Sequence, residues 1–344
     1  MDTNRAPGPW RITFDTNPDD CNLHCIMCEG HSKYADETHH SHRLMDIDVI
    51  RKTIEQMTPR GLREIIPSTM GEPLLYRYFD EIIELSSKYG IQINLTTNGT
   101  WPSLGPQKWA EKLCPVTSDI KISWNGASPK TQEYIMCGSD FSRRLDDLHT
   151  FIEVRDEIVA SGGNHCCLTL QCTFMETNLD ELEDIVRLAA ELGIERVKGH
   201  HLWVHSPKMQ HLDIRRSAES RSRWNTIVEK CRDVAEHSRL PYGKKVILDN
   251  FIPLPIEDNT IPAHWVCPFL GKEAWVNHEG RFDPCCAPDE QRQELGMFGY
   301  VTDNGGMEAI WGGVKYYSLL YGHMTHSLCK SCNMRRPEEG CGRD

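Results

Sequence analysis

The sequence has no long apolar run. No segment approaches the roughly 20 consecutive apolar residues that a helix needs to cross a bilayer. The chain begins Met1-Asp2-Thr3-Asn4-Arg5, without the basic start and apolar stretch of a secretory signal. Cations are scarce too: 38 Lys and Arg stand against 50 Asp and Glu, a net charge of −12, so a basic face for nucleic-acid phosphates is not expected. These absences predict a cytoplasmic protein with no membrane segment and no nucleic-acid partner.

Cysteine, by contrast, is abundant, with 15 residues in a chain of 344. Thiols stay reduced in the cytoplasm, and an odd number of cysteines does not suit a framework of disulfides. Metal ligation is therefore the expected use of some of them. The hydrophobic content of 39% and the charged content of 26% are typical of a globular protein long enough for one large and one smaller domain.

Three cysteines stand close together in the run Cys21-Asn22-Leu23-His24-Cys25-Ile26-Met27-Cys28, with the spacing C-x3-C-x2-C. Thiolates suit iron–sulfur clusters and zinc rather than hard cations. Three thiolates on one loop can bind one face of a [4Fe–4S] cluster, which takes four ligands, so one iron is left open for a substrate or cofactor. A single zinc ion is the alternative, although zinc motifs usually pair two short cysteine knuckles.

Strand-like and helix-like segments alternate from residue 10 to residue 204. Six strands are predicted within residues 10–15, 63–67, 91–96, 119–124, 165–174 and 196–204, and helices between them over 45–57, 79–89, 107–113, 141–160 and 179–192. This alternation predicts an α/β fold of parallel βαβ units with right-handed crossovers, curled into a partial (β/α)6 TIM-like barrel. Functional residues of such folds follow the carboxyl ends of the strands.

Polar residues stand at those strand ends. Gly71 and Glu72 follow the second strand, where a glycine permits close backbone approach and a carboxylate can accept hydrogen bonds from an ammonium group. A simple turn is the alternative. Four further candidates end later strands: Ser123, Gln171, Thr173 and the histidine pair His200-His201. Either histidine could orient a substrate or accept a proton.

The N-terminal cysteine motif, placed just after a predicted strand, resembles the signature of the radical S-adenosylmethionine (radical SAM) superfamily. Met70-Gly71-Glu72-Pro73 is similar to the family's G-G-E-P motif, and Ser123-Trp124-Asn125-Gly126 to its S-x-D-G motif. The resemblance implies a [4Fe–4S] cluster on Cys21, Cys25 and Cys28 whose open iron chelates S-adenosylmethionine. It also implies reductive cleavage of that cofactor to a 5'-deoxyadenosyl radical, which abstracts hydrogen from a substrate. The implied cofactor-binding residues are Gly71, Glu72 and Ser123, with Gln171 and Thr173 as further candidates.

A second group of cysteines lies near the C-terminus. Cys267 and Cys285 follow the pattern C-x12-G-x4-C around Gly280, and Cys329 and Cys332 form a C-x2-C knuckle. Residues 275–282 between the first pair predict a hairpin with Gly280 in its turn. The pattern resembles the twitch domain, the short form of the SPASM domain. It implies one auxiliary iron–sulfur cluster, of the [4Fe–4S] type, on these four cysteines; a zinc knuckle is the alternative. Whether Cys286 and Cys341 also bind a cluster is left open.

These patterns divide the chain into a radical SAM partial barrel (1–205), a bridging region (206–262) and an auxiliary-cluster domain (263–344). The bridging region predicts a polar helix over 215–239 and a short strand near Val246-Ile247. The cysteine motif begins at residue 21, so the N-terminal peptide-recognition domain of many peptide-modifying relatives is not expected. The chain therefore looks more like the branch that modifies sugars and aminocyclitols, which includes 2-deoxy-scyllo-inosamine dehydrogenase and cytosylglucuronate decarboxylase.

The expected function is hydrogen abstraction from a small polar substrate of the sugar or aminocyclitol type, in specialised metabolism. The product is an oxidised, epimerised or decarboxylated molecule, with the auxiliary cluster as electron relay and a flavodoxin or ferredoxin as reductant. One alternative is crosslinking or epimerisation of a ribosomally made peptide. The other is a protein that binds iron–sulfur clusters or zinc without catalysis. An electron carrier, however, needs neither an open iron nor a barrel of this size.

Overall fold

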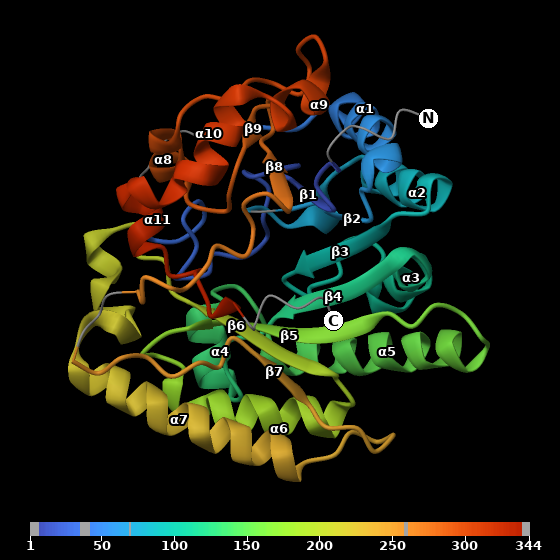
Figure 1. Cartoon of the computed structure of the whole chain (residues 1–344). Helices are drawn as coiled ribbons and strands as arrows, with labels where there is room; N and C mark the ends of the chain where they lie inside the picture. The colour runs from blue at the N-terminus through green and yellow to red at the C-terminus, as the bar shows by residue number, and fades with distance from the viewer. Residues whose placement is uncertain (1–6, 35–41, 69, 258–260, 339–344) are drawn as a thin grey trace.

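A single sheet organises the computed structural model, which describes residues 7–34, 42–68, 70–257 and 261–338 (Figure 1). Nine strands within these residues lie in the order β7-β6-β5-β4-β3-β2-β1-β8-β9. Every neighbouring pair is parallel except β8 and β9. The strands span β1 Arg11–Phe14, β2 Glu64–Ile66, β3 Gln92–Thr97, β4 Thr117–Ser123, β5 Cys167–Phe174, β6 Arg196–His201, β7 Ile247–Asp249, β8 Glu273–Val276 and β9 Phe282–Asp283.

Helices cover the outer face of this curved sheet (Figure 1). Those of the barrel are α1 Ile47–Met57, α2 Phe79–Tyr89, α3 Gly105–Leu113, α4 Pro129–Ile135, α5 Phe141–Ala160, α6 Leu182–Leu192 and α7 Ala218–His237. The C-terminal region adds α8 Asp289–Arg292, α9 Gly306–Trp311, α10 Val314–Gly322 and α11 Ser327–Ser331. None of the described helices combines the length and the apolar character that crossing a membrane requires.

The predicted α/β partial barrel is confirmed, and local signals explain why several helices end where expected. The helix predicted over 79–89 is α2, which stops at Gly90 in a left-handed conformation (φ 62°) that glycine adopts without strain. The helix predicted over 141–160 is α5, whose first turn is capped by the Asp140 side chain. Gly193 ends α6 in the same way as Gly90 ends α2. Helix α4 was not predicted, because its seven residues are too short to show a helical period.

The sheet extends beyond the six predicted strands. On one side β7, the short strand expected near Val246-Ile247, pairs with β6. On the other side β8 pairs in parallel with β1, and the predicted hairpin is confirmed, with Gly280 at φ 87° in the turn. The pairing of these strands with β6 and β1 was not predicted, because three- and four-residue strands carry no sign of their partner. The C-terminal region is thus joined to the barrel through the sheet itself.

Alternation along the strands gives the sheet two different faces. Side chains such as Ile12, Leu95, Ile120 and Leu170 face the helices and are buried in the main apolar core. The intervening residues face the interior of the barrel, because successive side chains of a strand point to opposite sides. We call these intervening residues the inner face.

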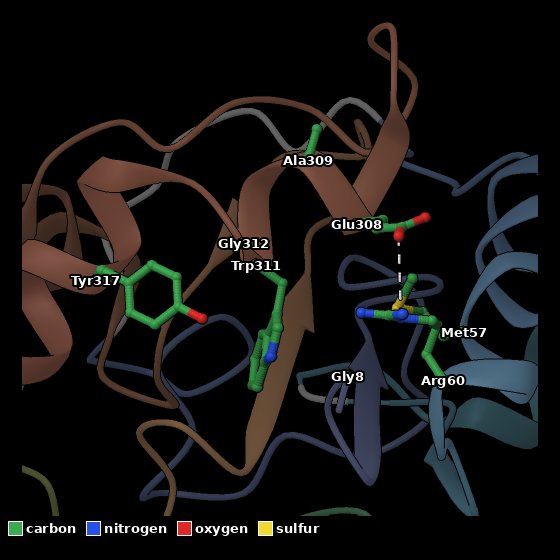
Figure 2. A pocket seen from close by; sticks show the side chains of 8 residues that line it. All are labelled: Gly8, Met57, Arg60, Glu308, Ala309, Trp311, Gly312 and Tyr317. Atoms are coloured by element: carbon green, nitrogen blue, oxygen red, sulfur yellow. Dashed lines mark ion pairs between the residues drawn. The ribbon is translucent and has the colours of Figure 1, made fainter. Parts of the chain in front are cut away.

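A surface pocket lies at the amino end of the sheet, between the end of α1 and helices α9 and α10 (Figure 2). Its lining includes Gly8, Trp311 and Tyr317, and the ion pair between Arg60 and Glu308 (3.9 Å) crosses it. Gly8 precedes β1, whereas the N-terminal cysteines follow that strand. The pocket is therefore at the opposite end of the barrel from the predicted site.

Candidate functional site

The cysteine loop (residues 21–28) follows β1 at the carboxyl end of the sheet. Two backbone hydrogen bonds fasten it to the segment after α4: His24 N donates to Cys137 O and Ile26 N to Ile135 O, both at 2.9 Å. Burial raises the pKa of the Cys25 thiol well above its usual range, and the neighbouring thiols Cys28 and Cys21 raise it further. The three predicted ligands therefore lie within electrostatic reach of one another, in a place where bare thiolates are unfavourable.

The Gly71-Glu72 turn packs directly on this loop. A Cβ atom at Gly71 would lie 2.0 Å from Asn17 O and 2.8 Å from Asp20 O, so only glycine fits. Glu72 N donates to Asp20 O at 2.8 Å, and Asn17 Nδ2 donates to Glu72 O at 2.9 Å. The turn is therefore joined to the segment that leads directly into the cysteine loop.

The Glu72 carboxylate is 2% exposed and fully engaged by the protein. It accepts hydrogen bonds from Thr97 Oγ1 and Asn98 N, both at 2.7 Å, and from Leu74 N at 3.2 Å. Burial raises its pKa to about 7 in spite of these donors. Its visible role is to hold the Thr97-Asn98-Gly99 turn beside the cysteine loop, where Asn98 Nδ2 also donates to Asn22 Oδ1 at 2.8 Å.

A buried cation, Arg144 from α5, lies behind these turns. Its Nη2 donates to Asn98 O and to Ser123 O, both at 2.6 Å, and thereby ties the ends of β3 and β4 together. The guanidinium lies 4.7 Å from the centre of the Trp124 ring. Its positive charge lowers the pKa of Cys25, against the stronger effect of burial. Sequence reasoning missed Arg144, because a charged residue in the first turn of a helix normally faces solvent.

The inner face brings together the other predicted cofactor-binding residues. Ser123 is the register neighbour of Gln171 across β4 and β5, and Thr173 is the neighbour of His200 across β5 and β6. Gln171 Nε2 lies 3.2 Å from His200 Nδ1. Burial lowers the pKa of His200 to about 4, so its imidazole is neutral at pH 7. Ser123, Gln171, Thr173 and His200 therefore form one continuous polar surface at the carboxyl ends of three strands.

The second histidine candidate, His201, is on the other face of β6. Its ring lies 4.8 Å from that of Trp224 and 5.6 Å from that of Phe174, both edge-on. Strand alternation separates it from His200, because adjacent residues point to opposite sides. The structure thus places one predicted histidine in the barrel and the other in the aromatic core against α7.

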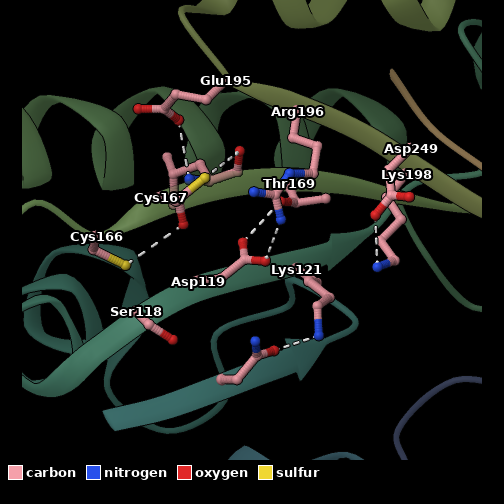
Figure 3. Close-up of polar contacts among 12 residues, drawn as sticks. Ser118, Asp119, Lys121, Cys166, Cys167, Thr169, Glu195, Arg196, Lys198 and Asp249 are labelled. Atoms are coloured by element: carbon pink, nitrogen blue, oxygen red, sulfur yellow. Dashed lines mark hydrogen bonds and ion pairs between the residues drawn. The ribbon is translucent and has the colours of Figure 1, made fainter. Parts of the chain in front are cut away.

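Deeper in the barrel, polar side chains of β4, β5, β6 and β7 contact one another (Figure 3). Asp119 accepts hydrogen bonds from Thr169 Oγ1 at 2.7 Å and from Arg196 at 3.1 Å. Lys198 Nζ lies 2.7 Å from Asp249 Oδ2, and these two side chains keep 28% and 30% of their surface exposed. The polar inner-face residues from β1 to β8 are Arg11, Thr13, Glu64, Asn94, Thr96, Asp119, Lys121, Ser123, Thr169, Gln171, Thr173, Arg196, Lys198, His200, Asp249 and Glu273. A closed (β/α)8 barrel fills this space with branched apolar side chains, whereas here polar side chains pair with one another across the interior.

The four cysteines predicted as auxiliary-cluster ligands, the C-terminal cysteine group (Cys267, Cys285, Cys329 and Cys332), lie within electrostatic reach of one another. Burial raises the pKa of Cys285 to about 12, and the thiols of the other three members raise it further. Cys329 lies in α11 and Cys332 directly after it. Cys286 is exposed, and Cys341 lies outside the described residues.

Residues 202–204 connect the two cysteine regions. Leu202 and Val204 pack with the apolar cluster that borders the cysteine loop. Trp203, between them, packs against the small cluster that borders the C-terminal cysteine group. One extended segment after β6 therefore touches both regions, with alternate side chains on alternate sides.

Within the described residues, no three His, Cys, Asp or Glu side chains are gathered tightly enough to hold a single metal ion. Around one zinc ion all ligands converge on the same atom, whereas each cysteine of a [4Fe–4S] cubane binds a different iron and the thiols stand farther apart. In both cysteine groups the thiols are close enough to raise one another's pKa.

Comparison with known proteins agrees with this chemistry. Residues 18–162 match the radical SAM superfamily, and residues 267–333 match SPASM, an iron–sulfur cluster-binding domain. The chain belongs to the radical SAM superfamily. It is a radical SAM enzyme that uses a [4Fe–4S] cluster with S-adenosylmethionine, and its SPASM domain provides auxiliary iron–sulfur binding.

Three similar proteins illustrate the range of the family. An S-adenosylmethionine-dependent nucleotide dehydratase of Selenomonas ruminantium is 24% identical over 178 residues, 52% of this chain and 61% of the relative, so the match spans less than two thirds of that protein. A tungsten-containing aldehyde ferredoxin oxidoreductase cofactor-modifying protein of Pyrococcus furiosus is 21% identical over 330 residues, 92% of this chain and 85% of the relative. The structure of Streptococcus suis SuiB bound to S-adenosylmethionine superposes with a TM-score of 0.66 at 13% identity, over 96% of this chain and 73% of SuiB. That likeness shows a shared fold.

Proposed function

We propose that this radical SAM enzyme oxidises a small polar substrate of the sugar or aminocyclitol type at a hydroxyl-bearing carbon. The observation that carries the proposal is the polar inner face of the barrel, which holds equal numbers of cations (Arg11, Lys121, Arg196, Lys198) and carboxylates (Glu64, Asp119, Asp249, Glu273). Such a surface offers many hydrogen-bond donors and acceptors but no net charge. It suits a hydroxylated or amino-substituted ring better than an apolar or a strongly charged molecule.

In this proposal Cys21, Cys25 and Cys28 hold the [4Fe–4S] cluster, and Gly71, Glu72, Ser123, Gln171 and Thr173 surround S-adenosylmethionine. The bound cluster and cofactor supply a 5'-deoxyadenosyl radical. Glu72 acts mainly through position, because its carboxylate is already occupied by Thr97 and Asn98, and the cofactor's ammonium group is left to backbone carbonyls of the turn.

His200 positions the substrate oxygen. The Gln171 amide nitrogen can only donate, so Nδ1 of His200 accepts from it and the neutral ring carries its proton on Nε2. A proton on Nε2 is a donor for the substrate hydroxyl and for the carbonyl that replaces it. His201 is not proposed for catalysis, because it packs against Trp224 and Phe174.

The C-terminal cysteine group holds the auxiliary cluster. Once the hydrogen atom has left the carbinol carbon, the substrate must lose one electron and the hydroxyl proton to become a carbonyl compound. The proposed route for the electron is toward the C-terminal cysteines, and the proton leaves to water in the polar barrel. The adjacent residues Leu202 and Trp203 support this route, because Leu202 packs beside the N-terminal cysteine loop and Trp203 beside the C-terminal cysteine group. A flavodoxin or ferredoxin is the proposed external reductant.

The test is anaerobic turnover of the reconstituted protein with S-adenosylmethionine, dithionite and a panel of aminocyclitols and sugars deuterated at each carbinol carbon. Transfer of deuterium into 5'-deoxyadenosine, together with a carbonyl product, is expected for at least one ring. A Cys329→Ala and Cys332→Ala double variant should still cleave the cofactor but form little product. Deuterium transfer from no ring, with cofactor cleavage intact, would refute the proposed substrate class.

A further inference from the structure

The pocket at the amino end of the sheet lies where the barrel meets the C-terminal region (Figure 2). The barrel contributes Gly8, Met57 and Arg60 to its lining, and the C-terminal region contributes Glu308, Ala309, Trp311, Gly312 and Tyr317. Its volume is about 310 Å³. Small-molecule sites begin near this volume, and they are common where two parts of a protein meet. The pocket is therefore large enough for one compact ligand.

One side of this pocket carries a cation and a carboxylate. Arg60 Nε and Glu308 Oε1 are 3.9 Å apart, which is longer than a hydrogen bond. The two side chains keep 21% and 30% of their surface exposed, so a molecule in the pocket can reach both. Gly8 lets the chain pass close behind them, because a Cβ atom there would lie 3.1 Å from Arg60 Cβ and 3.3 Å from Met57 Sδ. The pocket thus presents one donor group and one acceptor group side by side.

The rest of the lining is mainly aromatic and apolar. Trp311 is fixed in place, since its Nε1 donates to Pro7 O at 3.0 Å and its ring lies 4.8 Å from that of Tyr316. Tyr317 is half-buried, and the flexible thioether of Met57 adapts to the shape of a neighbour. In Figure 2, Trp311 lies between Tyr317 and the charged pair. The lining therefore suits a ligand with charges of both signs at one end and an apolar ring at the other.

We propose that this pocket binds a free α-amino acid with an aromatic side chain. The ligand carboxylate accepts hydrogen bonds from Arg60, the ligand ammonium group donates to Glu308, and both bonds are charge-assisted. The ring lies against Trp311, Tyr317 and Met57. Both charges of an α-amino acid are attached at one carbon, which matches a pair of side chains 3.9 Å apart.

Other ligand classes match this lining less well. A terminal residue of a peptide keeps only one of the two charges. A phosphate group would satisfy Arg60 but would be repelled by Glu308. The inference does not depend on the proposed substrate, because the pocket is at the opposite end of the barrel from the cysteine loop.

The test is isothermal calorimetry and thermal unfolding of the anaerobically reconstituted full chain with L-phenylalanine and L-tyrosine. At least one of them is expected to bind and to raise the midpoint of thermal unfolding, because a ligand that binds only the folded state stabilises it. Arg60→Met and Glu308→Gln should each weaken this binding about tenfold or more, the effect of one lost charged hydrogen bond. Matched controls are Arg63→Met and Glu294→Gln, which change exposed side chains outside the pocket. Iron content and circular dichroism verify that every variant is folded and loaded.

Two analogues separate direct contact from a structural role of the ion pair. The first, 3-phenylpropionate, has no ammonium group, so Glu308→Gln should leave its affinity unchanged while Arg60→Met weakens it. The second, 2-phenylethylamine, has no carboxylate, so the two variants should exchange their effects. A structural role would weaken every ligand alike in both variants. That result, affinities for the amino acids within about twofold of wild type in both variants, or no binding of either amino acid tighter than about 1 mM, would overturn the inference.

Discussion

Replacing Arg144 with methionine tests whether a buried cation fastens the two turns beside the cysteine loop. Arg144 is 3% exposed and donates to the main-chain carbonyls of Asn98 and Ser123 at 2.6 Å. Methionine has a similar length and fills the same space without charge. The substitution therefore removes two hydrogen bonds and leaves two carbonyls without their donor.

The expected change in the free energy of unfolding follows from two opposing terms. Hydrogen bonds from charged donors contribute about 1.5–3 kcal/mol each, so two lost bonds destabilise the fold by about 3–6 kcal/mol. Against this, burial lowers the pKa of Arg144 from 12.5 to about 10, a desolvation cost of roughly 3 kcal/mol that the variant no longer carries. The difference between the two terms leaves a net destabilisation of about 3 kcal/mol at most.

The assay is thermal and urea unfolding of the reconstituted protein, with Arg143→Met as control, because Arg143 is the exposed neighbour in the same turn. A second readout is the reduction potential of the N-terminal cluster, followed by electron paramagnetic resonance. Removing a positive charge that acts on Cys25 should make this potential more negative. Greater stability of Arg144→Met than of Arg143→Met, or an unchanged potential, would refute the reasoning.

Three further predictions concern other parts of the site. Gly71→Ala forces a methyl group onto Asn17 O and should reduce iron incorporation in the cysteine loop, whereas Gly30→Ala, with open space around it, should load normally. Burial lowers the pKa of Lys121 to about 8, and below that pH the buried charge destabilises the fold. Between pH 8 and pH 10.5 the free energy of unfolding of wild type should therefore rise by roughly 3 kcal/mol relative to that of Lys121→Met. Parallel curves of unfolding free energy against pH would contradict this. Cys329→Ala should lower iron from about eight to about four per chain, whereas an equal loss in Cys286→Ala would place that exposed cysteine among the ligands.

Much of the architecture was predictable because it is encoded locally. The spacing of apolar residues predicts α2 and α5 with correct ends. The residue types that cap them, Asp140 before α5 and Gly90 after α2, can be read directly from the sequence. The two cysteine groups were predicted from their spacing and from the resemblance to the radical SAM and twitch motifs. Gly71 was predicted from its place after the second strand and from its resemblance to the G-G-E-P motif, and the structure adds a backbone contact that excludes any side chain there.

Other features depend on contacts between distant segments. The sequence presents His200 and His201 as equals, and only the register of β6 sends one into the barrel and the other to Trp224. Glu72 looks like a free carboxylate until Thr97 and Asn98, from the next strand, are seen to occupy it.

The sequence by itself determined the chemistry of this protein: which thiols gather, which strand ends carry polar groups, and which fold presents them. These features follow from the spacing of cysteines and from the periods of helix and strand. Both patterns depend only on residues close together in the sequence. Only the tertiary structure decided that β8 joins the C-terminal domain to β1, that Arg144 lies buried behind the cysteine loop, and that His201 packs against Trp224. Those facts depend on pairings between residues up to hundreds of positions apart, and no local pattern records such pairings.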